Sequence, residues 1–324
     1  MISFLYELIK FKYWVSIHTL KQLSTLRKIM KSFVQKLTSN ITILLLILIT
    51  SISTASAKIK VVSTFSILGD MVQNIGGDEI ELTTLVGPNG DGHVYEPTPA
   101  DAKSIANADL VFINGLGFEG WIDRLVKASG YKGKVIIATK GIKDLKFEGE
   151  LDPHAWQDLS NGRIYIKNIK NALIDVDPKN SDLYEKNFIA YDEILESMDK
   201  STKEKFADIP KKKRKVITSH DAFLYFGRAY DIDFRSPVGV TTESEPSAGE
   251  LAALITEMRK DGIKALFAEN ITDPRLIKQL AREVNAEIGG TLYSDALSDA
   301  SEPANTYINM FKYNVKELAS VLSK

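Results

Sequence analysis

The 324-residue sequence contains no cysteine. This absence excludes disulfide bonds, thiolate metal ligands, cysteine nucleophiles and a lipid-modified N-terminal cysteine together. Histidine is scarce as well, with four residues in the whole chain. Neither a Gly-x-x-x-x-Gly-Lys-Ser/Thr loop nor an H-E-x-x-H motif occurs, so the signatures of a P-loop nucleotidase and of a zinc protease are missing. Any metal site in this chain would have to use nitrogen and oxygen donors.

A strong excess of either charge is also lacking, since the formal net charge is −1. The charges are nevertheless unevenly distributed, because residues 1–57 hold seven lysines and arginines against one acidic residue, Glu7. The rest of the chain holds 34 basic and 41 acidic side chains. An acidic chain repels a phosphate backbone, so we expect no nucleic acid among its partners. With 44% hydrophobic residues, the chain is long enough for two compact lobes.

The first 57 residues have the three parts of a secretory signal. Four lysines and arginines between residues 27 and 36 precede an apolar run at 41–49, and a stretch of small residues then ends in Ala-Ser-Ala at 55–57. The apolar run is shorter than the roughly 20 residues that span a bilayer. We therefore expect cleavage after Ala57, with a retained membrane anchor as the alternative.

Two further expectations follow from this leader. Met30 fits the start of translation better than Met1, because a signal rarely has so long a preamble. Without a cysteine at the cleavage site, no lipid would hold the mature product at a membrane. A second membrane would then be needed to retain it, so the expected location is a periplasm.

After Ala57, short β-branched runs alternate with amphipathic stretches, and this alternation occurs in two series separated by a long helical stretch. Alternating strands and helices predict a mainly parallel sheet with helices on both faces. The predicted fold is therefore α/β with two lobes. The predicted domains are a signal peptide at 1–57, an N-terminal α/β lobe at 58–180, a rigid linking helix at 181–207 and a C-terminal α/β lobe at 208–324.

Three histidines remain after the leader, which contains His18. His93 lies in a turn-rich loop between a predicted strand and a predicted helix, and His154 lies in a loop that leads out of the first lobe. A single histidine is more often a packed or solvated side chain than a ligand. The settings of these histidines therefore matter more than their number.

His220 and Asp295 directly follow predicted strands of the second lobe. Open α/β sheets bind ligands outside the carboxyl ends of their strands. The long separations of His93, His154, His220 and Asp295 along the chain exclude a local metal knuckle, so a shared ion would be held at the interface of the two lobes. Imidazole nitrogens with one carboxylate suit a borderline divalent ion such as zinc, and four protein ligands leave little room for a reactive water.

Five segments in order resemble landmarks of one family. They are G-H-V-Y-E-P-T-P at 92–99, D-P-H-A-W at 152–156, I-T-S-H-D-A-F-L-Y-F at 217–226, F-A-E-N at 267–270 and L-Y-S-D-A-L at 292–297. The sequence resembles the zinc- and manganese-binding solute-binding proteins of ABC transporters. The resemblance implies two lobes joined by a rigid helix, metal-ligand roles for His93, His154, His220 and Asp295, and a supporting carboxylate at Glu269. It also implies a monomer that delivers its metal to a membrane permease with a separate ATPase subunit.

One departure from the family pattern concerns the loop of His93, and two further features bear on the identity of the metal. Asp91 precedes Gly92-His93 where the family usually has a proline, and a long histidine-rich insert, common in zinc members, is missing between Lys143 and Leu151. Manganese members commonly have glutamate where this chain has His220. Because imidazole suits zinc better than manganese, we expect Zn2+ as the transported ion, with Mn2+ or Fe2+ as the alternatives.

Two kinds of enzyme compete with this interpretation. A zinc-dependent hydrolase would need three protein ligands, an open coordination position and a general base such as Glu269 or Glu96. A fourth ligand, Asp295, argues against it. A catalytic triad at 219–221 is excluded because adjacent side chains at the end of a strand diverge. We therefore expect no enzymatic activity.

Overall fold

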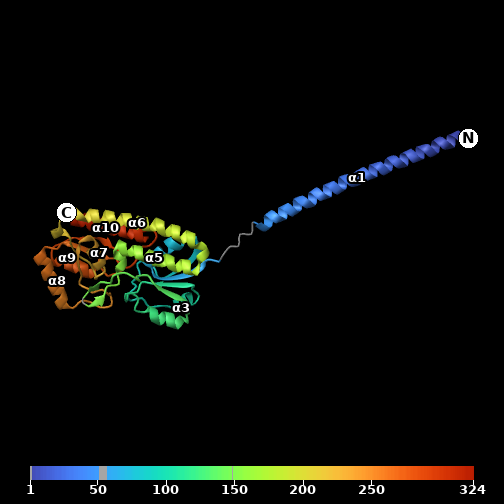
Figure 1. The fold of residues 1–324 in the computed structure, drawn as a ribbon. Coiled ribbons are helices and arrows are strands. Elements are labelled where there is room, and N and C mark those ends of the chain that lie inside the picture. The colour runs from blue at the N-terminus through green and yellow to red at the C-terminus, as the bar shows by residue number, and fades with distance from the viewer. Residues whose placement is uncertain (1, 51–56, 148) are drawn as a thin grey trace. The chain divides into compact units, whose positions relative to one another are not determined.

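Contacts divide the chain into two units, Met1–Ala57 and Lys58–Lys324. The computed structural model describes residues 2–50, 57–147 and 149–324, and side chains for all of these except 40–50. Helix α1 (Ile2–Thr50) belongs to the first unit (Figure 1). Residues 55 and 56 of the predicted cleavage site lie outside the described part. Within the described ranges, no helix combines the length and the apolar content that crossing a membrane requires.

The first sheet of the second unit has four parallel strands in the order β2-β1-β3-β4. Strand β3 is buried along its whole length, as expected for a strand covered on both faces. Helices α2 and α5 pack against each other and against strands of this sheet. The bounds are β1 (Ile59–Phe65), α2 (Ser66–Gly76), β2 (Ile80–Val86), α3 (Pro99–Ala106), β3 (Leu110–Ile113), α4 (Ile122–Ser129), β4 (Lys134–Ile137) and α5 (Leu159–Val176).

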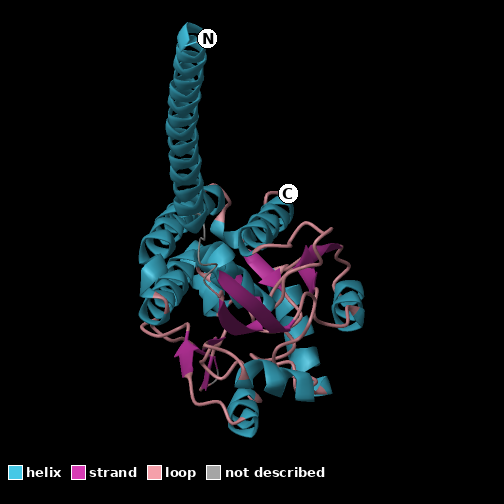
Figure 2. Cartoon of the chain, turned by 90° about the vertical axis from the view of Figure 1, so that its right-hand side faces the viewer, coloured by secondary structure: helices cyan, strands magenta, loops and turns pink. Residues whose placement is uncertain are grey.

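The second sheet also has four parallel strands, in the order β10-β9-β7-β8. Helices α9 and α10 pack on β9 and β10, and Figure 2 shows both magenta sheets with cyan helices around them. The bounds are β7 (Lys215–Ile217), α7 (Leu224–Tyr230), β8 (Asp233–Arg235), α8 (Ala248–Asp261), β9 (Ala265–Glu269), α9 (Arg275–Glu283), β10 (Ile288–Leu292) and α10 (Tyr307–Leu322). Two parallel sheets covered by helices confirm the predicted α/β fold with two lobes.

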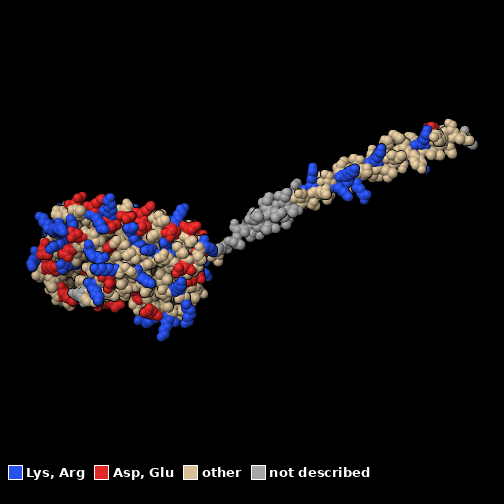
Figure 3. Space-filling view, in the orientation of Figure 1, with Lys and Arg blue, Asp and Glu red and all other residues tan. Residues whose placement is uncertain are grey.

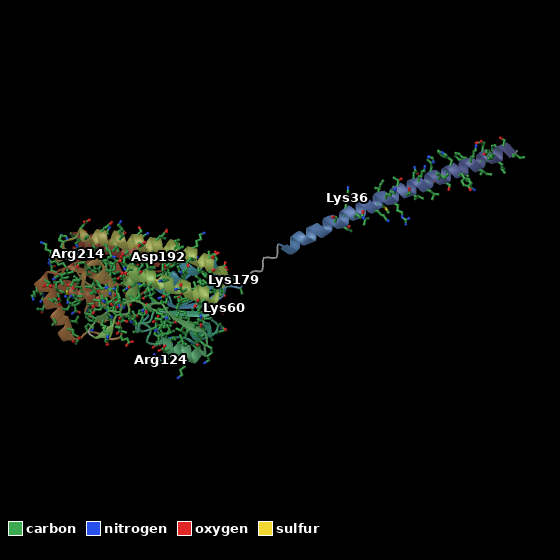
Figure 4. All side chains as sticks on the ribbon, viewed as in Figure 1. Lys36, Lys60, Arg124, Lys179, Asp192 and Arg214 are labelled. Carbon is green, nitrogen blue, oxygen red and sulfur yellow. The ribbon has the colours of Figure 1, made fainter. Side chains whose placement is uncertain are left out.

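Helix α6 (Ser181–Ala207) connects the two series of strands and helices. It packs against α2 and α5 of the first lobe and against α7 and α10 of the second. Tyr184, Tyr191, Leu195, Met198 and Phe206 form its buried side. Asp192, which is labelled in Figure 4, accepts two hydrogen bonds from Arg163 of α5, at 2.6 and 2.8 Å. Contacts with both lobes suit a rigid connection, and the exact lobe boundaries stay predictions.

The alternation of strands and helices in Lys58–Lys324 follows the predicted one, but three features of it were not predicted. Helix α7 and strand β8 are short, and the hairpin of β5 (Lys146–Phe147) and β6 (Glu150–Leu151) has only two residues in each strand. Elements this short contain too few side chains to show a hydrophobic period. The face of the second unit shown in Figure 3 has intermixed positive and negative side chains, which is typical of a solvated surface.

Candidate metal centre

The four predicted ligand residues come together between the lobes. One potential ligand atom from each of His93, His154, His220 and Asp295 lies within 4.8 Å of the other three. His93 keeps 4% of its surface exposed and the other three keep none. The fourth histidine of the chain, His18, lies on α1 and is not part of this cluster.

His93 is held by the loop between β2 and α3. Its backbone N–H donates to Asp91 Oδ1 at 2.9 Å, and the indole of Trp121 donates to the carbonyl of Gly92 at 2.8 Å. The ring of Phe118 meets the imidazole edge-on, with ring centres 4.7 Å apart. A Cβ atom at Gly92 would lie only 2.6 Å from this buried ring. Glycine is therefore needed where the loop passes Phe118.

His154 lies at the start of a short 3-10 helix, and Asp152 orients it. Oδ1 of Asp152 accepts the backbone N–H of His154 at 2.9 Å and lies 2.7 Å from the ring nitrogen Nδ1. Asn114 donates to the carbonyl of Pro153 at 2.9 Å, which fixes the intervening residue. The carboxylate leaves Nε2 of His154 free to face the other three residues. This arrangement is typical of histidines that bind metal ions.

Glu269 supports His220 in a similar way from the end of β9. Its Oε1 accepts the backbone N–H groups of Ser219 and His220 at 2.7 and 2.9 Å, and its Oε2 lies 2.6 Å from Nδ1 of His220. Glu269 is 2% exposed and does not itself join the four clustered residues. Its position therefore suits support of a ligand better than ligation.

Asp295 is positioned by two residues that the sequence did not mark for this role. The carbonyl of Ser294 accepts hydrogen bonds from Trp156 Nε1 at 2.9 Å and from Gln157 Nε2 at 2.8 Å. Both donors follow His154 closely in the chain, so the segment that carries one candidate ligand also fixes the segment that carries another. The D-P-H-A-W segment contains Trp156, but the partner of its indole is 138 residues away and has no local signal.

The facing atoms of five of the six residue pairs in the cluster lie 3.2–3.5 Å apart. Nε2 of His154 is 3.2 Å from Nε2 of His93 and 3.3 Å from Nε2 of His220. The carboxylate oxygens of Asp295 lie 3.3, 3.5 and 3.2 Å from Nε2 of His93, His154 and His220, respectively. A regular tetrahedron whose edges all had these lengths would have its centre about 2.0–2.1 Å from each corner, which is the length of a zinc–nitrogen bond. The four ligand atoms as a set lie within 4.8 Å of one another, so the arrangement is wider than such a tetrahedron between His93 and His220.

The carboxylate of Asp295 lacks a donor of its own. Apart from the three facing imidazoles, no described residue offers a donor to either of its oxygens, although both are fully buried. A buried acceptor without a partner costs about 1–3 kcal/mol, and a charged one costs more. A cation between this carboxylate and the three imidazoles would offset that cost.

Comparison with known proteins identifies the family. The family model described as zinc-uptake complex component A (ZnuA), periplasmic, matches residues 61–321. This chain belongs to that family.

Individual relatives of the family align over most of the chain. The metal ABC transporter substrate-binding lipoprotein SsaB of Streptococcus sanguinis is 38% identical over 283 residues, which are 84% of this chain and 92% of SsaB. The manganese ABC transporter substrate-binding lipoprotein PsaA of Streptococcus pneumoniae is 38% identical over 286 residues, with 85% and 92% covered. This chain is thus a metal-binding component of an ABC transporter, which works with a permease and an ATPase.

Solved structures agree with this assignment. The periplasmic zinc-binding protein TroA of Treponema pallidum superposes with a TM-score of 0.79 at 30% identity, with 82% of this chain and 100% of TroA covered. A periplasmic metal-binding protein of Candidatus Liberibacter asiaticus superposes with a TM-score of 0.76 at 35% identity, with the same coverage. The two-lobe fold around the four residues is therefore shared with ZnuA-family proteins.

Charges in the cluster favour protonated imidazoles when no metal is present. Burial alone would lower the pKa of His154, but the carboxylates of Asp295 and Asp152 outweigh burial and raise it to about 9. Burial also opposes protonation of His220, whose pKa Glu269 and Asp295 nevertheless raise well above the usual value. For His93, burial prevails and lowers the pKa. A metal ion would therefore replace protons in this site.

Proposed function

We propose that this chain captures one divalent transition metal ion with His93, His154, His220 and Asp295 and releases it to an ABC permease, with Zn2+ as the preferred ion. The observation that carries the proposal is the spacing of 3.2–3.5 Å between facing imidazole nitrogens and carboxylate oxygens in five of the six pairs of these residues. Uncharged rings and a carboxylate at this spacing need a cation or protons between them.

Donor chemistry supports zinc as the tightest-binding ion. The set contains three imidazole nitrogens and one carboxylate, and no thiolate. Affinity for nitrogen and oxygen sites rises from manganese through iron towards zinc in the usual order of divalent metals. Zinc also accepts four ligands without a geometric penalty, because it has a filled d shell.

Manganese is the alternative ion, and two observations favour it. Relatives such as PsaA of Streptococcus pneumoniae are named for manganese. Both oxygens of Asp295 face imidazoles, so the carboxylate could bind through two oxygens and enlarge the shell. Ligand atoms 3.2 Å apart also fit right-angled coordination with bonds of about 2.3 Å, which suits a larger ion with more ligands.

A zinc hydrolase receives less support. The candidate ligands keep 4% or less of their surface exposed, so a substrate would have no direct access to an ion held between them. Glu269 holds the backbone and ring of His220, and Glu96 is exposed outside the cluster. Neither glutamate is available as a general base.

A periplasmic location after cleavage at Ala57 is part of the proposal. The family description includes the word periplasmic, whereas SsaB and PsaA are named lipoproteins. A lipoprotein carries its lipid on a cysteine, and this sequence has none. Intact-mass measurement of exported protein should give Lys58 as the first residue and a monomeric species, and a product that retains residues 41–49 would refute the cleavage.

The metal is tested by elemental analysis of untagged protein purified without chelator, followed by competition between zinc and manganese. We expect one zinc ion per chain and displacement of manganese by zinc. Two results would contradict the proposal: a purified protein with no divalent ion that also fails to bind either metal, or a protein that keeps manganese when zinc is added in excess.

A further inference from the structure

A cavity of about 600 Å3 in the C-terminal lobe extends to one of the candidate ligands. Its inner end includes the buried residues Ser219 and His220, and its outer end includes the exposed residues Glu245 and Gln279. Among the described residues that line it, Asp91 alone comes from the N-terminal lobe. The cavity therefore lies at the cleft between the lobes and extends from exposed residues to His220, which is the one member of the four-residue cluster that lines it.

An ion bound to the cluster has no direct contact with solvent. His154, His220 and Asp295 have no exposed surface, and His93 has 4%. The ion must therefore pass between side chains, or the lobes must separate, each time it binds or leaves.

The charge of the cavity suits a cation. Asp273 at the outer end is neutralised by Arg275, whose guanidinium lies 2.7 Å from its carboxylate. Asp91 instead receives hydrogen bonds from uncharged donors, the hydroxyl of Thr242 and the backbone N–H of His93, and no cationic side chain among the described residues pairs with it. Together with Glu245, it gives the cavity a net negative charge, which attracts divalent cations from solution.

The inner end offers an oxygen next to His220. Oγ of Ser219 is buried and has no hydrogen-bond partner among the described residues. Ser219 lines the cavity beside His220. A metal ion must lose water molecules before the imidazole of His220 can bind it. The hydroxyl of Ser219 can take the place of one of these water molecules.

One hydrogen bond joins two residues that line the cavity, one from each lobe. The hydroxyl of Thr242, in the loop before α8, donates to Asp91 Oδ2 at 2.6 Å. Asp91 also holds the backbone of His93, so this bond joins the loop of a candidate ligand to the opposite lobe. Elsewhere on the same loop, the N–H of Asn89 donates to the carbonyl of Leu297 at 2.9 Å and ties the loop to the second lobe independently of the cavity.

We infer that the metal ion reaches and leaves His220 through this cavity, and that the hydrogen bond between Thr242 and Asp91 acts as its latch. This inference rests on the proposed metal-binding function. It assigns kinetic roles to Glu245, Thr242 and Leu276, none of which is one of the four candidate ligands. A route can be distinguished from a binding site by obstructing it. Obstruction of a route changes the association and dissociation rate constants by the same factor and leaves the dissociation constant unchanged.

The test is stopped-flow measurement of zinc binding and release with a chromophoric chelator, in three variants. Leu276→Trp places a large ring in the wall of the cavity, Glu245→Gln removes a charge at its outer end, and Thr242→Val removes the hydroxyl of the latch while keeping its shape. Matched controls on α6 are Ile189→Trp and Glu193→Gln, because both residues are exposed on a helix that does not line the cavity.

We expect Leu276→Trp to slow association and dissociation by the same factor, about tenfold, with an unchanged dissociation constant. Glu245→Gln should slow association about twofold to fivefold at low ionic strength only, and Thr242→Val should speed dissociation several-fold. If Leu276→Trp does not fold, the other two variants decide.

Zinc rate constants equal to those of the unsubstituted protein in the folded variants would overturn the route. Failure of the unsubstituted protein to bind zinc or manganese at all would instead overturn the proposed function, so the two failures are distinguishable.

Discussion

Asp152 contacts His154 twice, through the backbone N–H at 2.9 Å and through the ring nitrogen Nδ1 at 2.7 Å. The same carboxylate thus fixes both the position and the orientation of one candidate ligand. It also adds negative charge, which helps to raise the pKa of His154 to about 9. Replacement of this carboxylate should therefore alter both metal affinity and its pH dependence.

Asp152→Asn keeps the shape of the side chain and removes its charge. Loss of such a supporting carboxylate typically weakens metal binding 10- to 100-fold, and we expect a loss of about tenfold at pH 8.5. The pKa of His154 should fall, so affinity should depend less on pH between 7 and 9. Calorimetric titrations at several pH values check both effects. Asp144→Asn, at an exposed position in the preceding loop, is the control, and an equal loss of affinity in both variants would contradict the role of Asp152.

Metal binding should release protons at neutral pH. In the metal-free protein at pH 7, His154 with its pKa of about 9 and His220 with its strongly raised pKa both hold a proton, whereas His93 is neutral. Coordination requires neutral imidazoles, so about two protons should leave for each ion bound. Affinity should consequently fall steeply from pH 7 to pH 5.

Calorimetry in buffers with different ionisation enthalpies measures this proton release directly. The observed enthalpy should change with the buffer in proportion to about two protons at pH 7, and to fewer above pH 9. A binding enthalpy that is the same in all buffers, or an affinity that is constant from pH 7 to pH 5, would remove the histidines from the set of ligands.

The metal-free and metal-loaded proteins should respond to pH in opposite directions. A histidine whose folded pKa is raised stabilises the fold fully below its unfolded pKa of about 6.5 and loses that contribution as the pH rises through the folded value. For His154 this window runs from about pH 6.5 to about pH 9. Over it, the contribution of His154 to the free energy of unfolding falls by roughly 3 kcal/mol.

The melting temperature of metal-free protein should therefore fall by several degrees between pH 6.5 and pH 9. Zinc-loaded protein should become more stable over the same range, because zinc affinity rises as protons leave. Differential scanning calorimetry of both forms at matched ionic strength provides the comparison. If the melting temperature changes with pH in the same way in the metal-free and zinc-loaded forms, His154 does not exchange a proton for the metal.

The sequence predicted those features of the site that depend on local pattern. His220 and Asp295 follow β7 and β10, so the rule that ligands gather at the carboxyl ends of parallel strands selected them without knowledge of the fold. His93 and His154 have no such position, and their shared role depended on the resemblance to a family.

The hydrogen bonds that hold the candidate ligands in place were harder to predict, because they join residues far apart in the chain. The bonds from Trp156 and Gln157 to the carbonyl of Ser294 connect residues more than 130 positions apart, and one partner is a backbone atom with no side-chain signature. The bond between Thr242 and Asp91 is similar, since neither residue type distinguishes a latch from a solvated loop. Such contacts become visible only when both lobes are in place.

Selectivity between zinc and manganese provides the last prediction and concerns His220. His220→Glu exchanges a nitrogen donor for a carboxylate that can bind through two oxygens, so zinc affinity should fall and its advantage over manganese should narrow. The new carboxylate would face Glu269, which lies 2.6 Å from the present imidazole. Two adjacent carboxylates favour protonation of one of them, because their negative charges repel. Measurement at pH 8 limits this protonation.

Asp295→Ala should differ in kind from His220→Glu. It removes the single carboxylate that faces all three imidazoles, so zinc and manganese should both bind more weakly, by at least about a hundredfold, with little change in their ratio. Asp299→Ala, at an exposed position in the same loop, should leave both affinities unchanged. Calorimetric titration of the three variants with both metals separates the effects. Unchanged zinc affinity in His220→Glu would exclude His220 as a ligand and, with it, the chemical reason for preferring zinc, because two imidazoles and a carboxylate would then remain.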